Sequence, residues 1–158
     1  MGREIERKFL VRGDGWRSGA RGTRYRQGFL STDPDRTVRV RASQERGWLT
    51  VKGRTHGATR AEFEYPIPVG DANELLDALA VRPLVEKTRY RVDVSGLRWE
   101  VDVFEGDNEG LVVAEVELRS EDEDVVKPEW CGEEVTGDPR YYNASLVARP
   151  YSSWCDDS

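Results

Sequence analysis

The sequence predicts a mainly β protein of the α+β class, built from antiparallel strands and flanked by helices. Polar and apolar residues alternate with a period of two over many segments, which is typical of strands that bury one face. Short turn sequences such as Asp33-Pro34-Asp35 and Ser95-Gly96 separate these segments and suit β-hairpins. Two segments show the apolar spacing of helices instead.

The alternating segments predict eight strands. The chain has 158 residues, a size at which one domain can bury a substantial core. No repeat, low-complexity tract or linker divides it, so we expect a single domain over residues 1–150 and a loose C-terminal tail over residues 151–158. The expected strands cover residues 3–11, 24–32, 36–43, 46–53, 59–69, 84–95, 97–105 and 110–120.

Two helices are expected beside the strands. The first covers residues 71–79, where apolar residues recur at helical spacing and Asp71 is a suitable N-cap. The second covers about residues 139–147, with Asp138 as the cap and Pro139 at the first helical position. We expect the second helix to dock on the sheet.

Composition and charge exclude several classes of protein. The net charge is -6, which argues against a general nucleic-acid binder, because neutralising phosphates needs a basic surface. No apolar run approaches the length of a membrane span, and the N-terminus lacks an apolar signal core. A single histidine, and two cysteines without metal-ligand spacing, argue against a zinc site or a His-based triad. We therefore expect a cytoplasmic protein with no membrane or nucleic-acid partner.

The ionisable residues gather on one face of the expected strands, because side chains at positions i and i+2 of a strand point the same way. Seven of the eight expected strands carry such residues, and both signs are represented. We interpret Arg91 and Glu100 within this set as a structural ion pair. The acidic positions are Glu4, Glu6, Glu62, Glu64, Glu100, Asp102, Glu115 and Glu117. The basic positions are Lys8, Arg39, Arg41, Lys52, Lys87, Arg89 and Arg91.

This charged face has two interpretations, which the spacing alone leaves open. An antiparallel sheet can expose one face to water, but such a face would carry many Thr, Ser, Gln and Lys residues. Alternatively, the strands close into a barrel, which removes the sheet edges and encloses the charges in a lumen. In a lumen, Arg and Lys could surround a polyphosphate, and clustered carboxylates could hold a divalent cation. Oxygen ligands favour Mg²⁺ or Mn²⁺ over zinc.

The N-terminal segment Glu4-Ile5-Glu6-Arg7-Lys8 resembles the ExExK signature of the CYTH superfamily, the triphosphate tunnel metalloenzymes. The resemblance covers about residues 3–149. It is specific for this superfamily because several motifs occur in the family's order. The chain is most similar to the short bacterial inorganic triphosphatases of that superfamily. The further matching segments, in order, are Val38–Arg41, Leu49–Gly53, Ala61–Tyr65, Val85–Tyr90, Trp99–Phe104, Ala114–Leu118 and Glu134–Tyr141.

The resemblance implies an eight-stranded antiparallel β-barrel that forms a charged tunnel, with roles for individual residues. The residues expected to hold the Mg²⁺ or Mn²⁺ ion are Glu4, Glu6 and Glu117. Those expected to act in catalysis are Glu4, Glu6, Lys8, Asp102 and Glu117. Those expected to bind the substrate phosphates are Lys8, Arg39, Arg41, Lys52, Lys87 and Arg89. The supporting residues of the lining are Glu62, Glu64 and Glu115.

The activity that we expect is hydrolysis of the terminal phosphate of inorganic tripolyphosphate, which yields pyrophosphate and phosphate. One alternative is another enzyme on the same scaffold: a class IV adenylate cyclase, or a thiamine or nucleotide triphosphatase. The second alternative is a non-catalytic module that binds polyphosphate. In each case the partner is a small polyanion, and the protein is expected to be a monomer or a homodimer.

Overall fold

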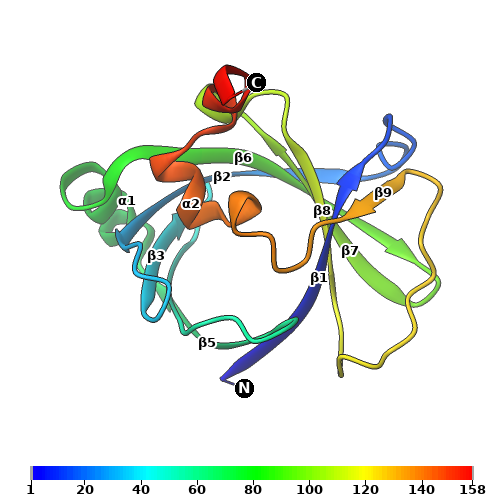
Figure 1. The fold of residues 1–158 in the computed structure, drawn as a ribbon. Coiled ribbons are helices and arrows are strands. Elements are labelled where there is room, and N and C mark those ends of the chain that lie inside the picture. Colours follow the sequence, from blue (N-terminus) through cyan, green and yellow to red (C-terminus); the bar gives the residue numbers. More distant parts are fainter. Residues whose placement is uncertain (1, 158) are drawn as a thin grey trace.

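The computed structural model describes residues 2–157, and it folds as a closed antiparallel β-barrel (Figure 1). The eight strands of the barrel lie close to their expected positions. Their bounds are β1 Arg3–Val11, β2 Arg21–Ser31, β3 Thr37–Ala42, β4 Gly47–Lys52, β5 Thr59–Ile67, β6 Val81–Val94, β7 Leu97–Phe104 and β8 Val112–Glu117. A ninth, short strand that the sequence did not predict is β9, Cys131–Glu134.

Strand β1 closes the ring. Around the barrel the strands follow the order β5-β4-β3-β2-β6-β7-β8-β1, and β1 pairs again with β5. Residues 3–5 of β1 pair with β5, whereas residues 6–10 pair with β8. The end of β1 also carries β9. The barrel interpretation is therefore confirmed, and the solvated open sheet is excluded.

The helices differ in detail from the expected ones. Helix α1 covers Val69–Ala78, and its N-cap is Pro68, so Asp71 lies in the first turn and not at the cap as predicted. The expected second helix is interrupted at Tyr142, whose backbone is extended. A 3-10 turn, Pro139–Tyr141, precedes this break, and α2, Asn143–Ala148, follows it. In residues 2–157 no helix has the length and apolar character needed to cross a bilayer.

The two remaining helical segments are short 3-10 helices. One covers Gly106–Asn108 between β7 and β8. The other covers Tyr151–Asp157, where the sequence led us to expect a loose tail; Ser158 lies outside the described residues. The rings of Tyr151 and Trp154 pack edge to face, with centroids 5.1 Å apart, against the apolar cluster under α2.

Much of the apolar core lies outside the barrel wall. Odd-numbered side chains of β1, such as Ile5 and Phe9, point outward and pack with Trp99 and Val116 under the segments that precede β2 and β9. On the other side, α1 covers the outward faces of β2, β3 and β4. Because these coverings bury the apolar faces, the lumen can carry charge.

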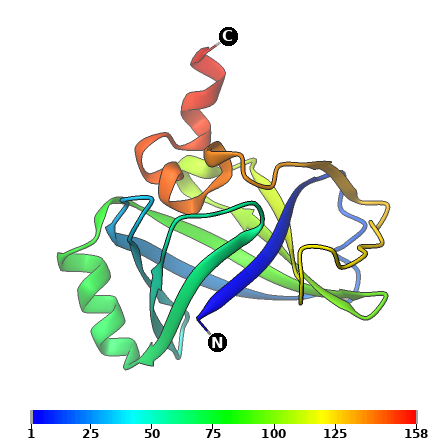
Figure 2. The same cartoon turned by 60° about the horizontal axis from the view of Figure 1, so that its bottom comes forward.

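The lumen itself changes character along its length. Towards α2, apolar side chains of β2, β6, β7 and β8 fill it and pack against Leu146 and Val147 of α2. In Figure 2, α2 and the preceding 3-10 turn lie across the end of the barrel. The charged part of the lumen is the part that this apolar cluster leaves open.

Candidate functional site in the barrel lumen

The lumen contains a cavity of about 490 Å³. Among the described residues that line it, nine are Lys or Arg and seven are Glu. The whole chain carries a net charge of -6, so the lumen concentrates the basic side chains of an acidic protein. A small anion can therefore be attracted into the cavity although the protein as a whole is negative.

The structure brings the predicted site residues together in this cavity. Those that line it are Glu4, Glu6, Lys8, Arg39, Arg41, Lys52, Glu62, Glu64, Lys87, Arg89, Glu115 and Glu117. The remaining one, Asp102, does not line the cavity, because it is buried behind two of the basic side chains.

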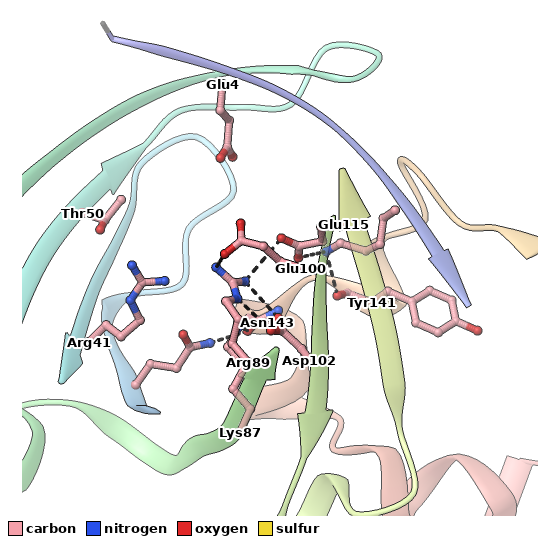
Figure 3. A network of polar contacts seen from close by, with 12 residues as sticks. Glu4, Arg41, Thr50, Lys87, Arg89, Glu100, Asp102, Glu115, Tyr141 and Asn143 are labelled. Carbon is pink, nitrogen blue, oxygen red and sulfur yellow. Dashed lines mark hydrogen bonds and ion pairs between the residues drawn. The ribbon is translucent and has the colours of Figure 1, made fainter. Parts of the chain in front are cut away.

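Asp102 holds two cations of β6 in place (Figure 3). Its carboxylate accepts a hydrogen bond of 2.7 Å from Lys87 Nζ and bonds of 2.7 and 2.9 Å from Arg89 Nε and Nη2. The side chains of Lys87 and Asp102 are both only 1% exposed. Arg89 also contacts Glu100 at 3.3 Å and Glu115 at 3.4 Å. We call these five residues the β6 cluster.

Burial and charge shift the ionisation of the β6 cluster. Burial alone would raise the pKa of Asp102, but Arg89 and Lys87 lower it well below its ordinary value. Burial lowers the pKa of Lys87 to about 7, against the opposing effect of Asp102. Burial would likewise raise the pKa of Glu115, but Lys8 and Arg89 lower it to about 2. Asp102 and Glu115 are therefore ionised at neutral pH.

The segment around α2 contacts the cluster from the apolar end of the lumen. Asn143 Oδ1 accepts hydrogen bonds from Lys87 Nζ, at 3.1 Å, and from Gln27 Nε2. Lys8 Nζ donates a bond of 3.2 Å to the carbonyl of Tyr141 and lies 3.7 Å from Glu115. These contacts connect α2 to the basic side chains of the cavity.

Arg39 and Arg41 of β3, which we call the β3 pair, are held more loosely. Both guanidinium groups reach the same Glu64 oxygen at 3.5 Å. That oxygen already accepts a bond of 2.8 Å from the hydroxyl of Thr50. The Nε atoms of both arginines are buried without a hydrogen-bond partner among the described residues. Buried N–H donors are rarely left unpaired, so the two guanidinium groups have bonding capacity that the protein itself does not use.

Aromatic rings fix the position of Arg41. Its guanidinium carbon lies 4.9 Å from the ring centroid of Tyr25 and 5.0 Å from that of Trp48. Such contacts favour the cation and restrict its movement without using its hydrogen-bond donors. Arg41 is thus positioned while its Nε remains available.

The predicted metal ligands line the same cavity on β1 and β8. Glu6 and Glu117 are directly opposite in the strand register, and the side chain of neither has a hydrogen bond or ion pair among the described residues. Glu4 accepts a bond of 3.0 Å from Lys52, which also contacts Glu62 at 3.3 Å. Burial and the nearby carboxylates of Glu115 and Glu4 raise the pKa of Glu6 to about 8.

The carboxylates of Glu6 and Glu117 suit a hard divalent cation by their chemistry, since they are oxygen ligands without an ion pair among the described residues. In residues 2–157, however, no three acidic, His or Cys side chains are close enough together to form a ready-made metal site. A cation at Glu6 and Glu117 would therefore need substrate oxygens or water to complete its coordination.

Some residues of the site were missed or misjudged from the sequence. Arg60 lines the cavity, and it could have been found because it shares the strand phase of Glu62. The ion pair that we predicted between Arg91 and Glu100 is wrong: Glu100 lines the cavity and pairs with Arg89, whereas Arg91 is exposed and contacts Asp93 at 3.4 Å. No sequence signal indicated that Asn143 would reach Lys87.

Comparisons with known proteins give a consistent result. The CYTH domain family model matches residues 2–151. A curated protein named inorganic triphosphatase, from Acetivibrio thermocellus, is 53% identical over 154 residues, which cover 98% of this chain and 99% of that one. Another of the same name, from Nitrosomonas europaea, is 40% identical over 150 residues and covers 91% of this chain and 96% of its own length. A crystal structure of the inorganic triphosphatase NE1496 has a TM-score of 0.64 at 38% identity, over 90% of this chain and 96% of that one.

Proposed function

We propose, because this chain belongs to the CYTH domain family, that it is a metal-dependent inorganic triphosphatase. It hydrolyses the terminal phosphate of inorganic tripolyphosphate and releases phosphate and pyrophosphate. The two curated relatives named inorganic triphosphatase, which align with nearly the whole chain, support this activity.

The observation that carries the proposal is the pair of buried arginine donors in the cavity. Arg39 and Arg41 both line the space of about 490 Å³, and their buried Nε atoms have no hydrogen-bond partner among the described residues. A guanidinium presents its donors in a planar fork that matches phosphate oxygens. A phosphate group bound here would give both guanidinium groups a charge-assisted partner, which is stronger than their long contacts to Glu64.

Catalysis follows from positioning and charge neutralisation, which dominate phosphoryl transfer. The β3 pair, Lys8 and Lys52 bind the phosphate oxygens and reduce the repulsion that an incoming water meets. Arg89, and Lys87 in its protonated form, contribute positive charge at a fixed position, since Asp102 prevents both side chains from moving away. A water oxygen bonds to the terminal phosphorus as the bridging bond to the pyrophosphate group breaks. The cluster under α2 limits the entry of other water.

The metal would be held at Glu4, Glu6 and Glu117. When bound, a divalent cation such as Mg²⁺ or Mn²⁺ neutralises phosphate charge and orients water. The missing ion pairs of Glu6 and Glu117 support this assignment. The nearby carboxylates that raise the pKa of Glu6 support it too, because a cation would replace the proton that their repulsion favours.

One experiment tests the activity against its alternatives. The protein is incubated with Mg²⁺ or Mn²⁺ and, separately, with tripolyphosphate, ATP or thiamine triphosphate, and then phosphate and cyclic AMP are assayed. We expect phosphate chiefly from tripolyphosphate, and none after EDTA treatment. Cyclic AMP from ATP would indicate a cyclase, preferred turnover of ATP or thiamine triphosphate would indicate that triphosphatase, and tight binding without turnover would indicate a binding module.

The setting of the enzyme belongs to the same proposal. We infer that it acts in the cytoplasm on a small polyanion, as a monomer or homodimer. The buried free thiol of Cys131 suits a reducing compartment.

A further inference from the structure

Arg60 is a cavity residue for which the proposed mechanism has no role so far. It lies on β5, two residues before Glu62, and its side chain lines the same cavity. In the pairing that closes the barrel it is opposite Glu4. It is therefore placed on the wall between the proposed metal ligands and the basic side chains of β3 and β4.

Two hydrogen bonds fix the direction of the Arg60 side chain. Its Nε donates to the carbonyl of Gly53 at 2.6 Å, and its Nη2 donates to the hydroxyl of Thr37 at 2.9 Å. Thr37 precedes Arg39 by two residues on β3, so the guanidinium lies one step further along the same wall. Because a guanidinium carries five N–H groups, these two bonds leave the Nη1 donors unused.

The charge of Arg60 is not neutralised by an ion pair. Both of its hydrogen-bond acceptors are neutral, and no carboxylate comes within ion-pair distance among the side chains that the structure describes. The predicted phosphate-binding residues all have such a partner, and Arg54, at the same end of the cavity, pairs with Asp35 at 2.5 Å. The electrostatic environment of Arg60 includes Glu4, Glu6 and Tyr142. Burial lowers the pKa of Arg60, but an arginine still remains protonated.

We propose that Arg60 is a further substrate-binding residue, which holds a phosphate group of the triphosphate at the part of the cavity wall beside Gly53 and Thr37. The assignment rests on the proposed function, since it takes the ligand to be a triphosphate. It extends the row of guanidinium groups formed by Arg41 and Arg39 by one more member. The unused donors and the unpaired charge carry the inference, because a half-buried cation of this kind favours an anionic ligand.

Arg60→Ala and the control Arg54→Ala test the assignment, since both remove a positive charge at the same end of the cavity. Binding of inorganic tripolyphosphate is measured by calorimetry in EDTA, and KM and kcat are measured in Mg²⁺. We expect Arg60→Ala to weaken binding and raise KM by about 10- to 100-fold, the effect of one charge-assisted hydrogen-bonding group. Arg54→Ala, whose partner is an exposed aspartate, should change both by less than about threefold.

A purely structural role for Arg60 predicts a different pattern. Thr37→Val removes the bond to Thr37 but keeps the cation, so it should change KM by less than about threefold if Arg60 binds phosphate. If Thr37→Val and Arg60→Ala weaken tripolyphosphate binding and raise KM equally, the assignment is overturned. If Arg60→Ala does not fold, Arg60→Gln retains an amide donor towards Gly53 without the charge, and the same loss of binding is expected.

The outcomes separate this inference from the proposed function. If the wild type hydrolyses tripolyphosphate and neither Arg60 variant differs from it, the assignment of Arg60 alone is overturned. If the wild type neither binds nor hydrolyses tripolyphosphate, the proposed function is overturned and the assignment with it.

Discussion

The two groups of cations in the lumen are built in different ways. In the β6 cluster, Lys87 and Arg89 bind a buried aspartate at 2.7 Å. The β3 pair shares one glutamate oxygen at 3.5 Å, and that glutamate side chain is 33% exposed. The cations of both groups line the same cavity. The groups differ in how many of the hydrogen-bond donors of these cations are used by the protein itself.

The difference teaches that fixing a charge and presenting it to a ligand are separate tasks. Buried charges are stable only when they are paired, so the β6 cluster is part of the fold as well as of the site. The β3 pair keeps buried donors unpaired, a cost that a bound phosphate removes. We therefore expect substitutions in the β6 cluster to affect stability most, and those in the β3 pair to affect substrate binding most.

The largest expected effect comes from Asp102→Asn. It leaves Lys87 and Arg89 without their shared counter-charge in a buried site, so the free energy of unfolding should fall by about 3–5 kcal/mol. The kcat should fall as well, because the two cations lose their fixed positions. Urea unfolding and steady-state kinetics measure the two effects. A variant as stable as the wild type would show that Asp102 does not hold this cluster together.

Next in size are the substitutions of the β3 pair. Arg39→Ala or Arg41→Ala should raise the KM for tripolyphosphate by about 10- to 100-fold, since each removes a charge-assisted contact. The free energy of unfolding should change less than in Asp102→Asn, because each arginine has only a long ion pair to lose, to which Arg41 adds its two ring contacts. An unchanged KM in both variants would contradict the role of the pair in phosphate binding.

A smaller effect is expected from pH, and it distinguishes lysine from arginine. Burial lowers the pKa of Lys87 from 10.5 to about 7, whereas burial lowers that of Arg41 only to about 10. As pH rises through 7, Lys87 loses its charge while the β3 pair keeps its own, so KM should rise by about tenfold. The KM is compared from about pH 6 to pH 8 in the wild type and in Lys87→Met, which retains the other titrating groups and lacks this step. Profiles of the same shape would show that Lys87 does not titrate there.

The same shift has a consequence for stability with a definite sign. Between pH 7 and 10.5 the unfolded chain binds a proton at Lys87 that the folded chain lacks. The contribution of Lys87 therefore makes the free energy of unfolding rise with pH in this window. The difference in unfolding free energy between wild type and Lys87→Met, measured across the window, isolates this contribution.

The smallest effect should be that of Glu64→Gln. The side chain is partly exposed and its ion pairs are long, so the free energy of unfolding should change by less than about 1 kcal/mol. A loss as large as that of Asp102→Asn would remove the distinction between the two groups of cations.

Much of the fold and the site followed from strand periodicity. Once Glu4 and Glu6 define the inward phase of β1, the i and i+2 rule assigns the inward residues of that strand, and the same rule works on the others. It identified the lining residues, and it would have found Arg60 had it been applied to the start of β5.

What periodicity could not predict is which side chains meet across the lumen. The pairing of Glu100 with Arg89 depends on the stagger of neighbouring strands. The alternation of residues along one strand shows which face a side chain is on, but not which residue of the next strand it contacts. The burial of Asp102 depends on the closed wall around it. The extended backbone at Tyr142, which interrupts the second helix, places Asn143 against Lys87 through tertiary contacts with no local sequence signal.

The double pairing of β1 sets an order of events during synthesis. This strand, with three of the proposed active-site side chains, leaves the ribosome before its partners. It can pair with β5 only after residues 59–61 have emerged, and with β8 only after residues 112–117. The ring is therefore completed late in translation by a strand made early, as expected for a topology dominated by non-local pairing. A nascent chain arrested before β8 contains the ExExK segment but no enclosed lumen, and so no triphosphatase.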